Sequence, residues 1–241
     1  MKAYVIVMSD NEKSLSGVET LKNSIETTGS KVELEIHEAV QPSNLGDTNF
    51  NIFGRTVPWT WPTESSSDAI DLHTGLYKRT YQAKDQRRVE ACALSHFGLW
   101  KKCVEENKPY LILEHDALFI KRFDPDKYSH KKWGVIGLND PQGNTRKGSM
   151  FSRQVQSKGK GIHDVPTIDA PGEPPLPMGI AGNSAYMIKP HLAEKLLQKI
   201  EELGMWPNDA IMCKQLFPNQ LKVVHPFYTT TQGTISTTVS L

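Results

Sequence analysis

Four short, continuous apolar segments limit the folds open to this chain. They span residues 3–8, 110–113, 133–138 and 185–188. Runs of this length are typical of strands buried on both faces, as in parallel sheets that are covered by helices. Segments with the apolar spacing of helices lie between or after them, at 18–27, 87–107 and 190–203. This alternation predicts an α/β fold in which crossover helices cover a mostly parallel sheet.

The chain is expected to open β-α-β and to form a single domain over residues 1–241. Its first apolar run ends in Ser9 and Asp10 without a small-residue cleavage site, so we interpret it as a strand and not as a secretion signal. Residues 32–37 alternate between apolar and polar side chains, as a half-exposed strand does, and 221–226 predict a late strand.

Two long segments, 42–86 and 139–178, lack periodicity and are predicted as loops. Loops this long inside a compact domain are more often functional or mobile than plain connectors. Trp59 and Trp61 can stack on an acceptor sugar, or they can simply anchor the first loop. Cations between residues 146 and 160 can help the second loop close over a donor and exclude water, although a plain disordered loop fits equally well.

Charge and cysteine content narrow the possible partners and compartment. The chain has 28 basic and 27 acidic residues, so no charge imbalance favours a nucleic acid, although one is not excluded. No run of about 18 apolar residues is present, and no transmembrane helix is predicted. Cys92, Cys103 and Cys213 lack metal-type spacing and suit a reducing compartment. We therefore expect a cytoplasmic protein.

An acidic triplet follows one of the buried strands directly. Glu114, His115 and Asp116 come after residues 110–113, and ligands of open α/β sheets bind at the carboxyl ends of strands. Two carboxylates one residue apart can converge on Mg²⁺ or Mn²⁺, which prefer oxygen ligands and substrate phosphates. Such an ion neutralises the charge that develops as a diphosphate leaves. Acidic residues at strand ends also commonly face only water, so the triplet alone leaves both interpretations open.

Further motifs occur before and after this strand. Residues 92–96 are Cys-Ala-Leu-Ser-His, 182–197 hold a Gly-x-x-x-Tyr strand with its following helix, and 207–209 are Pro-Asn-Asp. Together with the triplet at 114–116, they closely resemble glycosyltransferase family 25, the family of lipooligosaccharide β-galactosyltransferases and collagen galactosyltransferases. The resemblance covers most of the chain, and the two long segments are the parts that do not match.

The resemblance implies a GT-A-type fold, a Rossmann-like three-layer α/β sandwich that binds a nucleotide-diphosphate sugar through a carboxylate-bound divalent metal. It also implies inverting transfer of a hexose, galactose or glucose, from a UDP-sugar to a saccharide acceptor resembling lipooligosaccharide, with Mn²⁺ or Mg²⁺ as cofactor. Three departures concern the donor sugar more than the reaction type. His115 replaces a carboxylate, residues 88–91 replace the usual Gly-Glu-Ile-Gly, and residues 10–12 lack the arginine that is common just after the first strand.

Three residues are predicted to hold the metal. Glu114 and Asp116 are the first two, and His115 is expected to point the other way because side chains alternate along a strand. His225, at the end of the late strand, is predicted as the third ligand, with a surface histidine beside a turn as the alternative.

Four residues are predicted at the nucleotide pocket: Ser9, Ser95, His96 and Glu114. His96 lies on the buried face of its predicted helix, so we interpret it first as a satisfied core histidine that lies near the nucleotide pocket without chemistry of its own. Asp209 is predicted as the general base or as a residue that positions the acceptor, since a carboxylate suits deprotonation of a hydroxyl. An ordinary helix N-cap is the alternative for Asp209.

Two other functions stay open. The acceptor can be a protein, a lipid or modified DNA in place of a saccharide. The chain can also be a degenerate transferase that binds a nucleotide sugar without turnover, which the loss of a carboxylate at His115 would allow.

Overall fold

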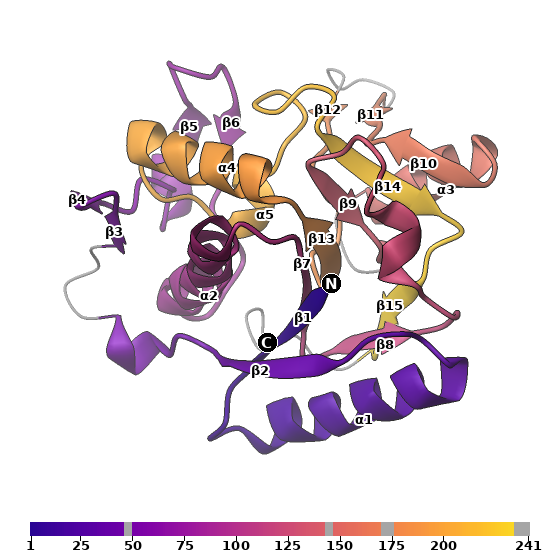
Figure 1. Cartoon of the computed structure of the whole chain (residues 1–241). Coiled ribbons are helices and arrows are strands. Elements are labelled where there is room, and N and C mark those ends of the chain that lie inside the picture. The colour runs from indigo at the N-terminus through magenta and orange to yellow at the C-terminus, as the bar shows by residue number, and fades with distance from the viewer. Residues whose placement is uncertain (46–49, 143–146, 170–175, 234–241) are drawn as a thin grey trace.

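The structure is a computed structural model, and it describes residues 1–45, 50–142, 147–169 and 176–233 of the chain. Within these residues, seven strands form a central sheet in the order β10-β14-β9-β13-β7-β1-β2 (Figure 1). The strands are β1 (Lys2–Val7), β2 (Leu34–Glu38), β7 (Tyr110–Glu114), β9 (Val135–Gly137), β10 (Gly161–Asp164), β13 (Ala185–Ile188) and β14 (Leu221–His225). All run in one direction except β13 and β10, which are antiparallel to their neighbours. The predicted mostly parallel sheet is confirmed.

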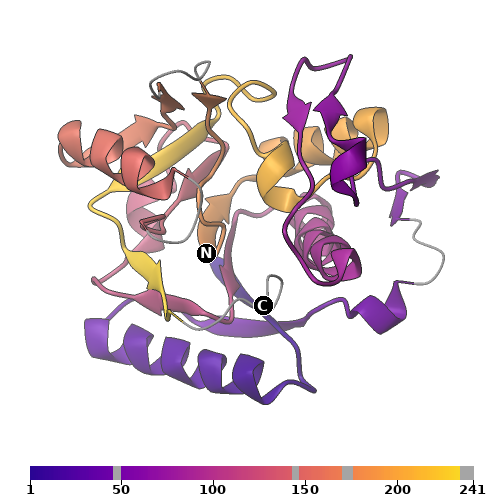
Figure 2. The same cartoon turned by 180° about the vertical axis from the view of Figure 1, so that it is seen from behind.

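Helices cover both faces of this sheet (Figures 1 and 2). They are α1 (Glu12–Thr28), α2 (Gln86–Glu106), α3 (Gly148–Ser157), α4 (Pro190–Leu203) and the short α5 (Asn208–Ile211). Leu21 of α1 shares a buried cluster with Val5 of β1, whereas Trp100 of α2 and Leu196 of α4 cluster with Tyr4. Because Tyr4 and Val5 point to opposite faces of a strand, α1 lies on one face and α2 with α4 on the other. The expected three-layer α/β sandwich is confirmed.

Polar caps set the starts of two helices. Asn11 begins α1 by accepting hydrogen bonds from two backbone N–H groups of the first turn, and Asp85 caps α2 in a similar way. Apolar spacing indicates α1 only from residue 18 onward, because its first turns are mostly polar. No helix in the described part of the chain combines the length and apolar character that a bilayer-spanning segment needs.

Residues 42–86 hold two small hairpins and two 3-10 turns in their described part. These are η1 (Pro42–Asn44), β3 (Phe50–Ile52), β4 (Arg55–Val57), η2 (Ser65–Ser67), β5 (Ala69–Ile70) and β6 (Tyr77–Lys78). The Trp61 ring packs on Trp206, with 5.3 Å between ring centroids, and its indole N–H donates to the carbonyl of Arg79. The backbone of Trp59 forms an isolated β-bridge with the backbone of Met205. These contacts support the anchoring interpretation, whereas stacking of an acceptor sugar on Trp59 and Trp61 stays a prediction.

Residues 139–178 contain more regular structure than the sequence predicts. Helix α3, the edge strand β10 and the short strands β11 (Thr167–Ile168) and β12 (Leu176–Pro177) fall within them. The large apolar residues that α3 buries are Phe151 and Val155, which are too few to produce a recognisable helical period. Of the cations expected to close over the donor, Arg146 lies outside the described residues, and the others lie in or next to α3.

The acidic triplet lies where the chain turns out of β7. After Asp116 the chain forms β8 (Ala117–Phe119), which pairs antiparallel with β15 (Thr229–Thr231), and then the 3-10 turn η3 (Pro125–Tyr128). Asp116 therefore occupies the short turn between β7 and β8, and both strands are held by pairing with other strands.

Candidate functional site

A cavity of about 590 Å³ lies at the carboxyl ends of β1, β2 and β7. These strands are parallel neighbours, so their carboxyl ends share one edge of the sheet. The wall of the cavity includes Asp10, Val40, Cys92, Ser95, His96 and Glu114. They come from the segments after β1 and β2, from one side of α2 and from the end of β7. This is the position where open α/β sheets bind their ligands.

Ser95 joins α2 to the segment after β2. Its hydroxyl donates to the carbonyl of Ala91 at 2.8 Å and accepts a hydrogen bond from the backbone N–H of Val40 at 2.9 Å. The side chain is buried, at 1% exposure. Ser95 therefore fixes the shape of the pocket wall on this side.

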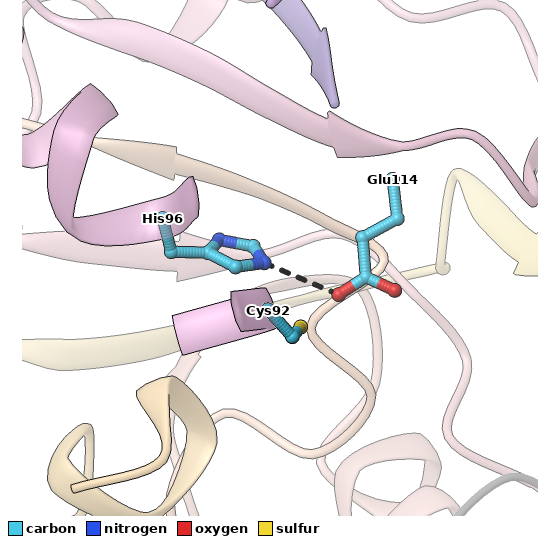
Figure 3. A group of neighbouring side chains, drawn as sticks. All are labelled: Cys92, His96 and Glu114. Atoms are coloured by element: carbon cyan, nitrogen blue, oxygen red, sulfur yellow. Dashed lines mark hydrogen bonds and ion pairs between the residues drawn. The ribbon is translucent and has the colours of Figure 1, made fainter. Parts of the chain in front are cut away.

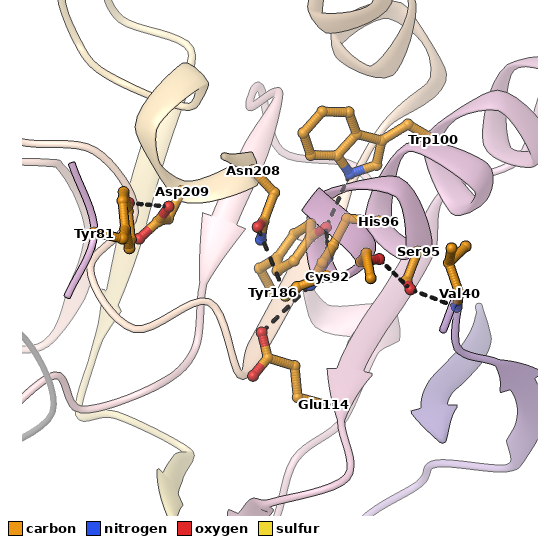
Figure 4. Close-up of polar contacts among 11 residues, drawn as sticks. Val40, Tyr81, Cys92, Ser95, His96, Trp100, Glu114, Tyr186, Asn208 and Asp209 are labelled. Carbon is orange, nitrogen blue, oxygen red and sulfur yellow. Dashed lines mark hydrogen bonds and ion pairs between the residues drawn. The ribbon is translucent and has the colours of Figure 1, made fainter. Parts of the chain in front are cut away.

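A chain of buried hydrogen bonds leads from α2 through β13 to the end of β7 (Figure 4). The Trp100 indole N–H donates to the Tyr186 hydroxyl oxygen at 2.8 Å, and the same hydroxyl lies 2.8 Å from His96 Nδ1. His96 Nε2 lies 3.3 Å from Glu114 Oε1. Burial favours the neutral form of Glu114, but the hydrogen bond and charge of His96 outweigh it and lower the Glu114 pKa. An ionised Glu114 can only accept, so His96 Nε2 donates to it, while His96 Nδ1 contacts the Tyr186 hydroxyl.

The surroundings of Asp116 favour its neutral form, whereas those of Glu114 favour its ionised form. Burial and then the charge of Glu114 raise the Asp116 pKa to about 7. Its Oδ1 atom is buried and has no hydrogen-bond partner among the described residues. A buried carboxylate oxygen without a partner is costly unless a cation or another donor satisfies it.

These two carboxylates fit a divalent cation. Asp116 is not among the residues that line the cavity, but it offers an oxygen that the described protein atoms leave unsatisfied, and the charge of the ionised Glu114 acts on its pKa. Oxygen donors of this kind suit Mg²⁺ or Mn²⁺, which keep coordination positions for substrate phosphates. Glu114 and Asp116 are therefore the residues that would hold such an ion.

A second donor group shares Glu114 (Figure 3). Atoms of Cys92, His96 and Glu114 that could bind a metal all lie within 4.8 Å of one another. A sulfur, nitrogen and oxygen set suits Zn²⁺ better than Mg²⁺ or Mn²⁺. Both His96 ring nitrogens already lie within hydrogen-bond distance of Tyr186 and Glu114, so a metal here would have to displace one contact. The two carboxylates are thus the better match for phosphate chemistry.

His115 is among the residues that line the cavity, whereas Ser9 is not. The His115 ring lies beside α1, with Cδ2 3.1 Å from the place a β-carbon on Gly17 would occupy. That is the sheet face opposite to α2, as strand alternation requires. Ser9 is exposed, and both its backbone N–H and its hydroxyl donate to Glu38 Oε1, at 3.0 and 2.9 Å. Its neighbour Asp10 lines the cavity.

The structure does not bring His225 to the acidic triplet. His225 ends β14, which is separated from β7 by β9 and β13. At a strand spacing of about 4.8 Å, this puts the two strand ends roughly 14 Å apart. His225 Nδ1 lies 3.0 Å from the carbonyl oxygen of Gly159.

Asp209 lies in a buried polar contact with the first long segment. The Tyr81 hydroxyl donates to Asp209 Oδ1 at 2.5 Å (Figure 4). Burial raises the Asp209 pKa, the Tyr81 hydrogen bond opposes the increase, and the charge of Glu114 adds to it. Because the charge of Glu114 affects it, Asp209 belongs to the same electrostatic environment as the acidic triplet.

The sequence model of glycosyltransferase family 25 (LPS biosynthesis protein) matches residues 2–212, which is most of the chain. The chain belongs to glycosyltransferase family 25. Sugar transfer is therefore the activity that family membership supports. A separate search of curated proteins found no match to the sequence of the chain.

Solved structures similar to this family 25 chain are distant. One is the apo form of the glycosyltransferase GlyE from Streptococcus pneumoniae TIGR4, at 12% identity and a TM-score of 0.39, over 93% of this chain and 45% of that chain. Another is the galactosyltransferase LgtC in complex with donor and acceptor sugar analogues, at 10% identity and a TM-score of 0.39, over 92% of this chain and 73% of that chain. Likenesses at this level say nothing about the substrates of this chain.

Two tyrosines of this family 25 chain contact predicted site residues although the sequence assigns them no role. Tyr186 ends the Gly-x-x-x-Tyr motif, and this motif could have marked it as a candidate site residue. Its contact with His96 was not predictable, because that contact depends on β13 lying next to β7. Tyr81 lies in an aperiodic segment, and no pattern in the sequence marks it.

Replacing Tyr186 with phenylalanine is expected to reduce both stability and turnover. The change leaves the buried Trp100 N–H without its acceptor and His96 Nδ1 without its hydroxyl partner. An unsatisfied buried donor costs about 1–3 kcal/mol. A His96 ring that is no longer fixed would hold Glu114 less firmly, so kcat should fall as well. Urea unfolding and transfer kinetics measure the two effects.

Tyr128→Phe is the matched control for this variant. The Tyr128 hydroxyl also forms a hydrogen bond, which is partly buried, to the Tyr228 hydroxyl at 2.9 Å, but on the α1 side of the sheet. It should lose stability without a specific loss of kcat. Equal kcat values in the two variants would show that Tyr186 has no role in positioning Glu114.

Proposed function

We propose that this chain transfers a hexose, galactose or glucose, from a UDP-sugar to a saccharide acceptor with inversion at the anomeric carbon, on a GT-A-type fold in the cytoplasm. The observation that supports it most is the pair of carboxylates after β7. Glu114 lines the cavity in ionised form, and Asp116 has a buried oxygen without a partner among the described residues.

The metal hypothesis follows from this pair. Mn²⁺ or Mg²⁺ held by Glu114 and Asp116 would neutralise the negative charge of a departing diphosphate. The neighbouring wall of the cavity, formed by Ser95, Val40 and the segment after β1, is the place we propose for the nucleotide. His96 contacts Tyr186 through Nδ1 and Glu114 through Nε2, and it thereby fixes the orientation of the Glu114 carboxylate.

Asp209 is proposed as the general base. An inverting transfer needs a group that takes the proton of the acceptor hydroxyl as the new bond forms. Burial raises the Asp209 pKa above that of an exposed aspartate, which makes the carboxylate a stronger base. Tyr81 orients this carboxylate through its 2.5 Å hydrogen bond. A saccharide acceptor would then approach from the side of the segment that carries Tyr81.

Nucleotide binding tests this proposal directly. UDP, GDP, CMP and ADP are added to the protein, each with and without Mn²⁺ or Mg²⁺, and the melting temperature is measured. A ligand at about 100 times its Kd stabilises a protein by roughly 2.7 kcal/mol, which corresponds to several degrees for a chain of this size. We expect such a shift for UDP, and we expect it to require the metal.

Asp116→Asn is the control for the metal-dependent part of the shift, which it should lose. A metal-independent shift with UDP would contradict the role of the two carboxylates. A shift with GDP or CMP alone would indicate that the donor is a sugar linked to that nucleotide and not a UDP-sugar. The absence of a shift with every nucleotide would contradict donor binding itself.

A further inference from the structure

A second cavity, also of about 590 Å³, lies at the opposite edge of the sheet. Strand β13 is antiparallel to β7, so Lys189 at the end of β13 lies on the edge away from Glu114. The cavity is lined by the segment before β9, the first turns of α4 and the start of β14. It is therefore separate from the proposed site of sugar transfer.

Basic side chains dominate the lining of this cavity. We call it the lysine pocket, after Lys131, Lys132, Lys189, Lys195 and Lys222. His130 and His191 also line it, and no acidic side chain of the described residues does. The whole chain has a net charge of only +1, so this concentration of positive charge is local.

Part of the lysine pocket is held in place by other contacts. The Lys189 ammonium donates to the carbonyl of Lys131 at 2.8 Å and lies 4.4 Å from the centroid of the Trp133 ring. Lys222 pairs with Asp164 at 2.5 Å, at the side of the cavity. Lys132 and Lys195 are exposed and take part in no ion pair among the described residues. The pocket thus combines a fixed ammonium with two that can close on a ligand.

The positive charges in the lysine pocket repel one another. The pKa of His191 is lowered by burial and then by the charges of Lys189 and Lys195, and burial also lowers the pKa of Lys189. Helix α4 begins here with no side-chain cap, so its N-terminal end adds further positive potential. A bound anion would relieve this repulsion and would favour the protonated form of His191.

We propose that the lysine pocket binds a phosphate group, carried either by a soluble phosphate ester or by a lipid headgroup. Several ammonium groups around a concave space suit a compact, multiply charged oxyanion, since hydrogen bonds between charged partners are the strong ones. The pocket has a volume fit for such a group and for part of the molecule that carries it.

Inorganic pyrophosphate is the probe for the soluble form. The protein, labelled at its eight histidines and kept in EDTA at low salt, is titrated while the ring signals are followed by NMR. We expect a saturable change at His191 and a rise in its pKa. The double variant Lys132→Ala/Lys195→Ala should bind about tenfold more weakly or worse, since it removes the two exposed ammonium groups that can close on the anion. Sedimentation with phosphatidylcholine vesicles, with and without phosphatidic acid, tests the headgroup form.

The control is Lys101→Ala/Lys121→Ala, which removes the same charge from two exposed lysines outside the pocket. Pyrophosphate binding that only the pocket variant weakens assigns a soluble phosphate ester. Vesicle binding with the same dependence, without saturable pyrophosphate binding, assigns a headgroup. Equal weakening by the control, histidine changes confined to His96 and His115, or no binding in either experiment would overturn the proposal.

Discussion

Sugar transfer is expected to be almost abolished when Asp116 is replaced by alanine or asparagine, while the chain remains folded. The proposed metal would lose one of its two carboxylates, and a metal contribution of several kcal/mol to the transition state corresponds to a fall in kcat of roughly a thousandfold. The change is measured as transfer to a saccharide acceptor with saturating UDP-sugar and Mn²⁺. Asp126→Asn, at an exposed aspartate of η3, is the control and should keep its activity.

The same substitution should stabilise the metal-free protein at alkaline pH. The Asp116 pKa is about 7 in the folded chain, above an ordinary value of about 3.9 in the unfolded chain. Its protonation therefore supports folding fully below about pH 4, and this support is lost as the pH rises to about 7. In EDTA at pH 8, Asp116→Asn should exceed the wild type by on the order of 3 kcal/mol, and the difference should vanish near pH 4. Calorimetry at both pH values measures it.

Two results would contradict this account. A near-normal rate of the Asp116 variants in excess Mn²⁺ would show that Asp116 does not hold a metal that the reaction needs. A metal-free asparagine variant that is less stable than the wild type at pH 8 would show that the buried Oδ1 has a partner after all. Together, these measurements separate a metal ligand from a structural carboxylate.

The sheet was largely predictable because burial on both faces leaves a mark in the sequence. Ile112 and Met187 are fully buried, and each lies in a continuous apolar run. The same pattern cannot give strand direction, so the reversal of β13 was not predictable. Helix α3 escaped prediction because its packing rests on few apolar residues, Phe151 and Val155 among them.

The site was predictable residue by residue but not as an arrangement. Motifs marked His96 and Glu114, and the structure places them 3.3 Å apart. Tyr186, which completes the hydrogen-bond chain, comes from a third element, and only strand order brings it there. His225 was predicted as a metal ligand because it ends a strand. In the sheet, however, β9 and β13 lie between β14 and β7, so His225 does not lie next to Glu114.

Replacing Asp209 with asparagine is expected to reduce kcat by roughly 10²–10⁴-fold, the usual contribution of a general base, with donor affinity nearly unchanged. Asparagine keeps the shape of the side chain and can still accept the Tyr81 hydrogen bond, but it cannot take a proton from the acceptor. The comparison requires kcat from transfer kinetics and the Kd of UDP with Mn²⁺ from calorimetry. Comparable losses in both quantities would make Asp209 a donor ligand or a structural residue.

Tyr81→Phe distinguishes the base from a merely structural carboxylate by its pH dependence. The Tyr81 hydrogen bond lowers the Asp209 pKa, so its removal should raise that pKa further above its ordinary value. Since only ionised Asp209 can accept a proton, the acid side of the kcat/KM profile should move to higher pH, with a smaller loss at its plateau than in Asp209→Asn. A profile that loses height without moving would mean that Asp209 does not act as the base, because its ionisation would then leave the rate unaffected.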